Sequence, residues 1–471
     1  MTTSSPFRST AKLMMASLML AMTAAAPVKA ATASRVTEFT LGNGMQVVVV
    51  PDHRAPVVTH MVWYRVGAAD EPKGVSGIAH FLEHLMFKST DKIPMGEFSK
   101  IVAKLGGQDN AFTGHDVTSY FQRISKDRLE TVMGMEADRM VNLRLTEKEV
   151  LTERDVILEE RRSRIENNPA AILDEQMDAM LYYSHPYGIP VIGWEHEMAK
   201  LSPANAMTFY KRYYAPNNAI LVVAGDVEPG EVKMLAEKTY GLIPATPGSL
   251  RDPRPQDPPA RAARRVEVKD PRAGKASFHR DYIAPSYTTA KPGEAEALDL
   301  LMKIAADGPT SRIYKKLVIE GQLASSAGGG YEGSGLDGTK ISLYAVSADG
   351  VGLDKVEAAI DATLNDIVKN GVTAAELERA KNGYIAEYVY DNDNQNNMAR
   401  RYGWGIAVGR SVKQIESWPD DIAKVTLDDI KKVAGEYLDM RRSVTGTLIP
   451  SAPDASEQVA KPAQPAPANR S

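Results

Sequence analysis

Stretches of β-branched and aromatic residues near the start of the chain predict strands. Residues 35–52, RVTEFTLGNGMQVVVVPD, have the pattern of a strand, a Gly-Asn-Gly turn and a second strand. Residues 55–67, APVVTHMVWYRVG, predict a further strand of the same kind. The run NAILVVAGDV, which starts at Asn218, is almost wholly apolar and is typical of a buried strand.

Helical periodicity alternates with these strands. Apolar residues recur at helical spacing in five segments, which we expect to be helices: residues 76–87, 95–105, 126–141, 147 into the 160s, and 229 to about 240. Thr146 and Glu149 stand at the start of the fourth segment in the spacing of a capping box. Because strands and helices are mixed without a regular βαβ alternation, the pattern predicts an α+β fold.

The composition changes in the middle and at the end of the chain. Residues 249–265 are rich in proline and poor in apolar side chains, which predicts an extended linker. Residues 451–471 are Pro/Ala-rich, so we expect this tail to be disordered. The 471 residues exceed the roughly 250 to 300 at which a single core stops growing. We therefore expect two lobes, formed by residues 31–248 and residues 266–450.

Residues 1–30 have the three-part layout of a secretory signal peptide. Arg8 and Lys12 precede an apolar run of 14 residues, and small residues spaced for cleavage end at Ala30. The run is shorter than the roughly 20 residues that span a bilayer. We therefore expect export across the inner membrane to the periplasm, with a mitochondrial transit peptide as the alternative.

The overall composition argues against several classes of protein. A net charge of -4 without a long basic run gives no electrostatic footprint for nucleic acid. The absence of cysteine means that no disulfide framework is present, which is compatible with export but only weakly supports it. After the signal segment no apolar stretch reaches spanning length, so we expect no membrane span in the mature chain.

The segment GIAHFLEHLMF, residues 77–87, carries the strongest chemical signal. Placed on a helix, its apolar residues form one stripe that must pack inward: Ile78, Phe81, Leu82, Leu85 and Met86. His80, Glu83 and His84 fall on a separate face at i, i+3 and i+4, so both imidazoles point the same way. The alternative is a solvated polar face that happens to carry two histidines.

Zinc suits this arrangement because two imidazoles one turn apart can reach a single tetrahedral ion. Glu83 lies one turn beyond His80, where it can accept a proton from a zinc-bound water instead of binding the metal. A catalytic zinc also needs a third protein ligand and an open position for water.

A second helix offers candidate carboxylates for this third position. Glu153 and Glu160 are seven residues apart, about 700° of rotation at 3.6 residues per turn, and so lie on nearly the same face. Glu159 is about 100° away from that face. One glutamate of the pair could bind the metal and the other act beside it. An ordinary exposed acidic face has the same spacing, so the pattern alone leaves both interpretations open.

Several segments in a fixed order resemble the inverted zincins of the pitrilysin type. H-x-x-E-H is followed about seventy residues later by ERDVILEE, as in this family. Three further segments look like family segments: GGQDNAFTGHDVTSYF, HPYGIPVIGWEHEM and YYAPNNAILVVAGDV. The similarity covers nearly the whole predicted mature chain. Within the family, the chain resembles bacterial zinc peptidases and the β subunit of mitochondrial processing peptidases.

The resemblance implies roles for individual residues. His80, His84 and Glu160 would be the ligands of one Zn²⁺, Glu83 the general base, and Glu153 an additional catalytic glutamate near the metal. The family fold implies two similar α+β lobes, each a mostly antiparallel sheet with helices packed on one face. A faint similarity between EKTYGLIPATP and RRSVTGTLIPSAP, near the ends of the two predicted lobes, agrees with such a duplication.

The resemblance also implies a substrate strand. Asn110 and Ala111 in NAFT would contact an extended peptide at a sheet edge, where main-chain hydrogen bonds hold the substrate whatever its side chains. Without the family, NAFT reads as an ordinary strand after a Gly-Gly turn.

One departure from the family pattern indicates that the chain works with a second subunit. Family members present an Arg and a Tyr to the substrate from a segment resembling LRxxxxLgY, but this chain has LVIEGQLASSA, with Val318 and Ser325 at those places. These side chains cannot give the charge-assisted hydrogen bonds of an Arg. The resemblance therefore implies a heterodimer with a zinc-free homologous subunit, with a homodimer as the second choice.

Together these features predict a zinc-dependent endopeptidase that hydrolyses peptides or unfolded polypeptides. The alternative is a non-catalytic binding or scaffold subunit on the same fold, since zinc-free subunits occur in the family. Such subunits lose ligand or base residues, whereas this chain retains the whole set.

Overall fold

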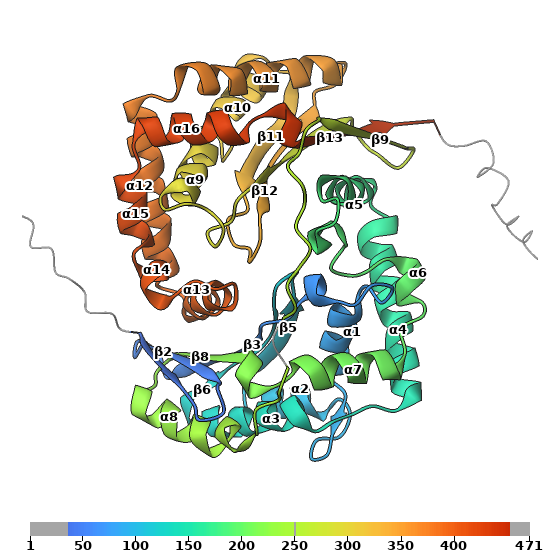
Figure 1. Cartoon of the computed structure of the whole chain (residues 1–471), viewed down its shortest axis with the longest axis vertical. Coiled ribbons are helices and arrows are strands. Elements are labelled where there is room, and N and C mark those ends of the chain that lie inside the picture. The colour runs from blue at the N-terminus through green and yellow to red at the C-terminus, as the bar shows by residue number, and fades with distance from the viewer. Residues whose placement is uncertain (1–35, 249–250, 453–471) are drawn as a thin grey trace, which may run out of the picture. The chain divides into compact units, whose positions relative to one another are not determined.

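Two β-sheets with associated helices form the two lobes of the protein (Figure 1). The computed structural model describes residues 36–248 and 251–452. The predicted signal segment, residues 1–30, and nearly all of the predicted tail lie outside the described residues. Two lobes of mixed strands and helices confirm the predicted α+β fold class.

The first sheet has the strand order β1-β2-β8-β3-β6-β5. Its strands are β1 (Thr37–Thr40), β2 (Gln46–Pro51), β3 (Val57–Tyr64), β5 (Gln108–Thr113), β6 (Thr118–Ser125) and β8 (Ala219–Gly225). A separate short pair joins β4 (Ser89–Thr90) to β7 (Leu143–Arg144). The helices of this half are α1 (Ile78–Leu85), α2 (Glu97–Lys104), α3 (Leu129–Val141), α4 (Glu147–Arg161), α5 (Pro169–Leu181), α6 (Glu195–Met198), α7 (Pro203–Tyr213) and α8 (Pro229–Lys238).

The second sheet has the strand order β11-β12-β10-β13-β9. Its strands are β9 (Arg264–Asp270), β10 (Ser277–Ala284), β11 (Ala324–Tyr331), β12 (Thr339–Ser347) and β13 (Ser443–Pro450). Its helices are α9 (Glu294–Ala305), α10 (Arg312–Tyr314), α11 (Leu353–Asn370), α12 (Ala374–Asp391), α13 (Gln395–Ala407), α14 (Val412–Glu416), α15 (Trp418–Lys424) and α16 (Leu427–Tyr437).

The two sheets repeat one topology. In each sheet one strand pairs in parallel with the last strand of its half, β2 with β8 and β9 with β13, and the other pairs are antiparallel. The counterparts of β2, β8, β3, β6 and β5 are therefore β9, β13, β10, β12 and β11. The short sequence similarity did not reveal this repeat, because EKTYGLIPATP lies around the end of α8 and RRSVTGTLIPSAP covers β13, which are not counterparts.

One helix from each half packs on the sheet of the other half. Helix α13 packs on the face of the first sheet that carries Met61 and Trp63 of β3, and α5 packs on β13 and β9 of the second sheet. The two helices hold equivalent places in the order of elements, and Figure 1 places each beside the strands that it covers. The exchange buries the second face of both sheets, so neither lobe has a complete core by itself.

The proline-rich connection between the sheets is anchored along its course. Residues 251–263 contain no helix or strand, and β9 begins at Arg264. The Arg254 guanidinium, with its side chain 5% exposed, pairs with Asp70 at 2.9 Å and Asp116 at 2.5 Å in the first half and with Asp337 at 3.0 Å in the second. This segment therefore ties the two halves together in addition to connecting them.

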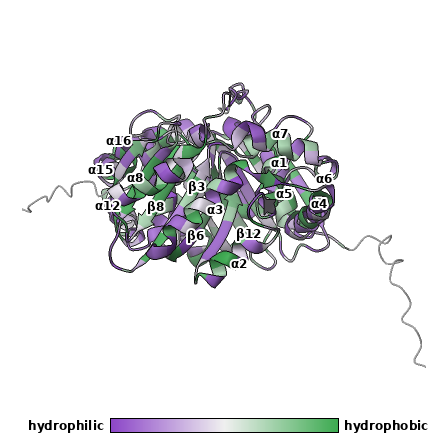
Figure 2. Ribbon diagram, turned by 90° about the horizontal axis from the view of Figure 1, so that it is seen from below, coloured by the Kyte–Doolittle hydropathy of each residue, from purple (hydrophilic) through white to green (hydrophobic). Residues whose placement is uncertain are grey.

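Hydrophobic and hydrophilic residues both occur along most helices, as expected when each helix buries one face (Figure 2). Within the described residues, no helix combines the length and the apolar character that a transmembrane crossing requires.

Candidate metal centre

Helix α1 owes its position to two features of its first turn. Gly77, which precedes the helix, has φ +84, and a Cβ there would lie 2.5 Å from the carbonyl oxygen of Ile192. Only glycine allows this combination of backbone conformation and close approach. The buried carboxylate of Glu71 accepts hydrogen bonds of 2.8 Å from the N–H groups of Gly77 and Ala79, so it caps the helix.

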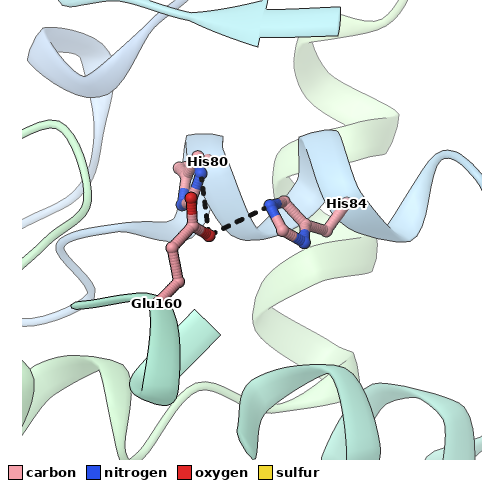
Figure 3. Close-up of side chains that lie close together, drawn as sticks. All are labelled: His80, His84 and Glu160. Carbon is pink, nitrogen blue, oxygen red and sulfur yellow. Dashed lines mark ion pairs between the residues drawn. The ribbon is translucent and has the colours of Figure 1, made fainter. Parts of the chain in front are cut away.

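The helix buries its apolar stripe in the first core and presents a polar face to α4. His80 and Glu83 are 7% and 9% exposed, and Ile78, Phe81, Leu82 and Leu85 are almost fully buried. Figure 3 shows His80 and His84 on one helix with the Glu160 carboxylate of α4 facing both. The interpretation of this segment as a solvated helix face is therefore wrong.

Three side-chain ligand atoms converge at this point. Nε2 of His80 and Nε2 of His84 lie 3.7 Å and 3.4 Å from Oε2 of Glu160. These separations exceed the usual 2.7 to 3.2 Å of an N–H···O hydrogen bond. A tetrahedral zinc with bonds of about 2.0 to 2.1 Å holds its ligand atoms about 3.3 Å apart, which is close to what is observed.

The chemistry of the donor set also fits a cation. Oε2 of Glu160 is buried and accepts no hydrogen bond from the described residues. A buried carboxylate oxygen without a donor is costly unless a cation satisfies it. Among the described residues, His80, His84 and Glu160 are the one group of His, Cys, Asp or Glu side chains close enough together to hold a metal ion.

Glu153 contacts a ligand and not the position between the ligands. Its Oε1 lies 2.8 Å from Nδ1 of His84, and its Oε2 lies 2.5 Å from Nζ of Lys88. The hydrogen bond with His84 and then the Lys88 contact lower the pKa of Glu153 to about 2. A charged Glu153 holds the proton on Nδ1 of His84, so Nε2 is the nitrogen that gives up its proton when a metal binds.

Arg164, from the π-helical turn Arg162–Glu166 that continues α4, holds the other oxygen of the third carboxylate. Its Nη2 lies 2.6 Å from Oε1 of Glu160. The close approach of the His84 ring, 3.4 Å away, together with the charges of the two histidines and Arg164, lowers the pKa of Glu160. Glu160 is therefore ionised at neutral pH.

The two histidines titrate differently. Burial, followed by the charge of His84, lowers the pKa of His80 to about 4. Burial also acts to lower the pKa of His84, but its interactions with Glu153 and Glu160 outweigh burial and raise it to about 9. A metal that binds this site must therefore displace one proton, from His84.

Glu83 lies beside the ligands and is held by a strand residue. Oγ1 of Thr113, the last residue of β5, donates a 2.6 Å hydrogen bond to Oε2 of Glu83. Burial raises the pKa of Glu83, and the hydrogen bond from Thr113 partly opposes this shift. The site thus combines three candidate metal-ligand atoms with a carboxylate of raised proton affinity, an arrangement suited to general-base chemistry at a metal.

The predicted substrate strand lies at the edge of the first sheet. β5 pairs with β6 on one side only, and Asn110 is exposed. Oδ1 of Asn110 accepts a 2.8 Å hydrogen bond from the N–H of Ala111. The N–H of Ala111 therefore already has a hydrogen-bond acceptor within the strand.

Val318 and Ser325 lie apart from the metal ligands in the second half. Val318 packs against the second core, and Ser325 lies at an irregularity in the pairing of β11 with β12, where its hydroxyl donates to the carbonyl of Val346 at 3.3 Å. Both side chains therefore have structural contacts.

Sequence reasoning missed several residues that support the site. Lys88 and Arg164 follow His84 and Glu160 by four residues, so helical i,i+4 spacing could have identified them. Thr113 lies in the NAFT segment, but no pattern links it to Glu83 thirty residues away. No sequence pattern pointed to Glu71, because its hydrogen bonds to Gly77 and Ala79 span a loop and do not follow helical or strand spacing.

The chain is similar to known zinc proteases over most of its length. It is 32% identical over 416 residues to the zinc protease PqqE of Helicobacter pylori, covering 87% of this chain and 92% of that one. It is 24% identical to a probable mitochondrial-processing peptidase subunit beta of Arabidopsis thaliana, covering 87% of this chain and 77% of the relative.

Solved structures have the same fold. A protease from Helicobacter pylori superposes with a TM-score of 0.83 at 30% identity, covering 88% of this chain and 99% of that one. The periplasmic protease PqqL from Escherichia coli has a TM-score of 0.75 at 18% identity, and the match covers 93% of this chain but 52% of PqqL.

Two family models match successive parts of the chain. The model of insulinase, peptidase family M16, matches residues 46–194, which contain the three metal-ligand candidates, and the model of the M16 inactive domain matches residues 200–384. With the long match to PqqE, these results confirm the predicted resemblance: the chain belongs to peptidase family M16.

Proposed function

We propose that this chain is a zinc-dependent endopeptidase. The observation that carries the proposal is the meeting of His80, His84 and Glu160 beside the buried, hydrogen-bonded carboxylate of Glu83. These three side chains would hold a zinc ion, which as a Lewis acid would polarise the scissile carbonyl and make water more acidic.

Glu83 is the general base in this proposal. Its carboxylate takes a proton from the attacking water and passes it to the leaving amine. The raised pKa of Glu83 lies closer to neutral pH than that of an ordinary glutamate, and a group with a pKa near the working pH can both accept and release a proton. Glu153 is a positioning residue that keeps the correct nitrogen of His84 directed at the metal.

The free edge of β5 is the proposed binding place for an extended peptide. Its main-chain groups near Asn110 and Ala111 are accessible at one side, and β5 ends at Thr113, which touches Glu83. Pairing through the backbone accepts many side chains, which suits peptides or unfolded polypeptides as substrates.

We also infer that a second homologous subunit completes the site. PqqL is about twice as long as the matched region, so this chain corresponds to one half of a protein of that kind. Val318 and Ser325 supply no charged donor for a developing oxyanion. We expect this subunit to be a zinc-free homologue, and a second copy of the same chain is the alternative. The purified chain alone is therefore expected to be weakly active, and full activity of a monodisperse monomer would contradict a required partner.

The proposed location is the periplasm, on the basis of the predicted signal segment, residues 1–30. PqqL is a periplasmic protease, which supports this location, whereas the similarity to a mitochondrial-processing peptidase subunit of Arabidopsis supports the mitochondrial alternative.

The decisive experiment compares Glu83→Gln with Glu159→Gln. Glu159 lies on α4 with a side chain 71% exposed, so its substitution controls for loss of a surface charge. Glu83→Gln should bind zinc stoichiometrically but hydrolyse quenched fluorescent peptides about 100-fold to 10,000-fold more slowly, the usual contribution of a general base. Hydrolysis at the original rate would refute the assignment of Glu83.

A non-catalytic binding subunit is the remaining alternative, supported by the match of residues 200–384 to the inactive-domain model. That match covers the half without the metal ligands, whereas the ligand set and Glu83 lie in the other match. If the chain bound zinc but cleaved no peptide with any homologous partner, the binding function would be favoured.

A further inference from the structure

The second lobe contains counterparts of the elements that form the metal centre. Gly77 and Gly293 both precede a helix that follows the equivalent strands β3 and β10, and both have a left-handed φ, +84 and +82. Six residues later these helices carry Glu83 and Asp299. His84 corresponds to Leu300, so the second lobe cannot form the same metal site.

The helices α4 and α12 correspond in the same way. Both begin with a capping box, Thr146 with Glu149 and Thr373 with Glu376. Fourteen residues after the capping threonine, Glu160 has its counterpart in Glu387. Glu387 forms a 2.7 Å ion pair with Lys303, so its charge is neutralised within the protein and not by a metal.

A pocket of about 330 Å³ lies where these counterparts meet. Its walls come from α9, α12, α13, the end of β11 and the helices after α13. They carry aromatic rings together with five charged side chains: Asp299, Glu387, Asp391, Arg401 and Arg410. We call it the aromatic pocket, and its principal lining residues are Tyr287, Tyr331, Tyr384, Tyr388, Trp418 and Arg410.

The rings form an ordered group. Trp418 is stacked on Tyr388 with centroids 5.7 Å apart and meets Tyr384 edge-on at 5.8 Å. The indole N–H of Trp418 donates a 2.5 Å hydrogen bond to Oη of Tyr287, which donates in turn to Asp299. The wall is therefore fixed by mutual contacts before any ligand arrives.

Arg410 is the unusual charge in this wall. Its guanidinium lies 4.4 Å from the ring centroid of Tyr287, and it donates a 3.0 Å hydrogen bond to the carbonyl of Gln414. Throughout residues 36–248 and 251–452, no carboxylate lies within ion-pair distance of it. Burial lowers the pKa of Arg410, and the nearby groups Tyr287, Glu296 and Asp299 oppose this shift only in part.

A cationic ligand does not suit the aromatic pocket. Three of its ring faces already carry cations of the protein: Arg410 on Tyr287, Arg401 on Tyr388 at 4.0 Å, and Lys303 on Tyr384 at 4.8 Å. A further cation would meet these positive charges, and the acidic lining residues Glu387 and Asp391 are already paired with Lys303 and Arg401.

We propose that the aromatic pocket binds a carboxylate carried next to an aromatic or bulky apolar group, as at the C-terminal residue of a peptide. The planar guanidinium of Arg410 offers a bidentate partner to the carboxylate, and the tyrosine and tryptophan rings cover the apolar group.

A path leads from this site toward the proposed substrate strand. The aromatic pocket shares Tyr331, Gly333 and Ser334 with a second hollow, which extends to Gly114 directly after β5. The end of a peptide bound along β5 can therefore reach it. This route rests on the proposed peptidase function, whereas binding of the carboxylate ligand does not.

Calorimetric titration of the full, zinc-loaded chain with N-acetyl-L-phenylalanine tests the proposal. Two matched ligands remove one feature each: N-acetyl-L-phenylalaninamide lacks the carboxylate, and N-acetylglycine lacks the ring. Each should bind at least about tenfold more weakly than the parent acid, because a charged hydrogen bond or a buried ring is lost. The proposal would be overturned if the acid and the amide bound with equal affinity. It would also be overturned if the acid gave no heat of binding at about 10 mM, a concentration that would occupy even a weak site with a Kd of about 1 mM.

A variant and a metal control locate the binding. Arg410→Met should weaken binding of the acid at least about tenfold, whereas Arg442→Met, which removes another stacked arginine over Tyr437, should not. Binding must survive removal of zinc by a chelator, because a carboxylate could otherwise be bound at the metal centre. Loss of binding with the metal, or unchanged binding in Arg410→Met, would refute the site even if hydrolysis were established. If Arg410→Met did not fold, the acid and amide comparison on the unaltered, metal-free chain would decide.

Discussion

The hydroxyl of Thr113 donates a 2.6 Å hydrogen bond to the carboxylate of Glu83 and so joins the end of the edge strand β5 to helix α1, which carries two of the candidate metal ligands. Glu83 is 9% exposed, and burial raises its pKa. The contact holds the carboxylate in one orientation and stabilises its ionised form. The strand proposed to bind the substrate therefore also positions the proposed base.

Thr113→Val should reduce kcat about tenfold with little change in KM, since a hydrogen bond to a charged group contributes about 1.5 to 3 kcal/mol. The acid limb of the pH profile of kcat/KM should move to higher pH, because the variant loses an interaction that lowers the pKa of Glu83. Thr113→Ser keeps the hydroxyl and should restore both values. An unmoved acid limb in the valine variant would argue against Glu83 as the titrating base.

Glu153→Gln should weaken zinc binding by about 10-fold to 100-fold, the usual effect of removing the partner that orients a metal-binding histidine. The variant loses the charge that lies 2.8 Å from Nδ1 of His84. Competition with a fluorescent chelator measures the change, and Glu159→Gln serves as the control on the same helix. Equal zinc affinity in the two variants would exclude a positioning role for Glu153.

Zinc affinity of the unaltered chain should rise about tenfold per pH unit between pH 6 and pH 8, as expected when one proton is displaced. In the metal-free protein the pKa of His84 is raised to about 9, so His84 is protonated throughout this range and must lose its proton to bind zinc. His80, with a pKa lowered to about 4, is neutral and contributes no slope. A chelator titration at several pH values gives the slope, and a flat profile would contradict the proton on His84.

Gly403→Ala should destabilise the protein by about 1 to 3 kcal/mol, the usual cost of overpacking a core. Gly403 lies on α13 against the first sheet, where an added Cβ would be 2.1 Å from Nε1 of Trp63. Gly134→Ala, in α3 with open space around it, should instead stabilise by about 0.4 to 1 kcal/mol through a less flexible unfolded chain. Thermal melting of the two variants checks both values, and equal midpoints would mean that α13 does not pack tightly on the first sheet.

The sequence by itself indicated much of the site because the spacing within one helix is fixed by helix geometry. His80, Glu83 and His84 share a face of α1 whatever the rest of the chain does. The apolar stripe forms a separate face of the helix, and this stripe packs inward. The strands and helices could also be predicted, since their periodicity is local.

Only the tertiary structure decided how segments distant in sequence meet. Spacing on α4 could not distinguish Glu153 from Glu160, because both lie on one face; packing against α1 turns Glu160 to both histidines and Glu153 to Nδ1 of His84. The contact of Thr113 with Glu83, the exchange of α5 and α13 between the sheets, and the anchoring of the linker by Arg254 belong to the same class. Such contacts depend on how buried surfaces fit together in three dimensions, and no local pattern of residues encodes that fit.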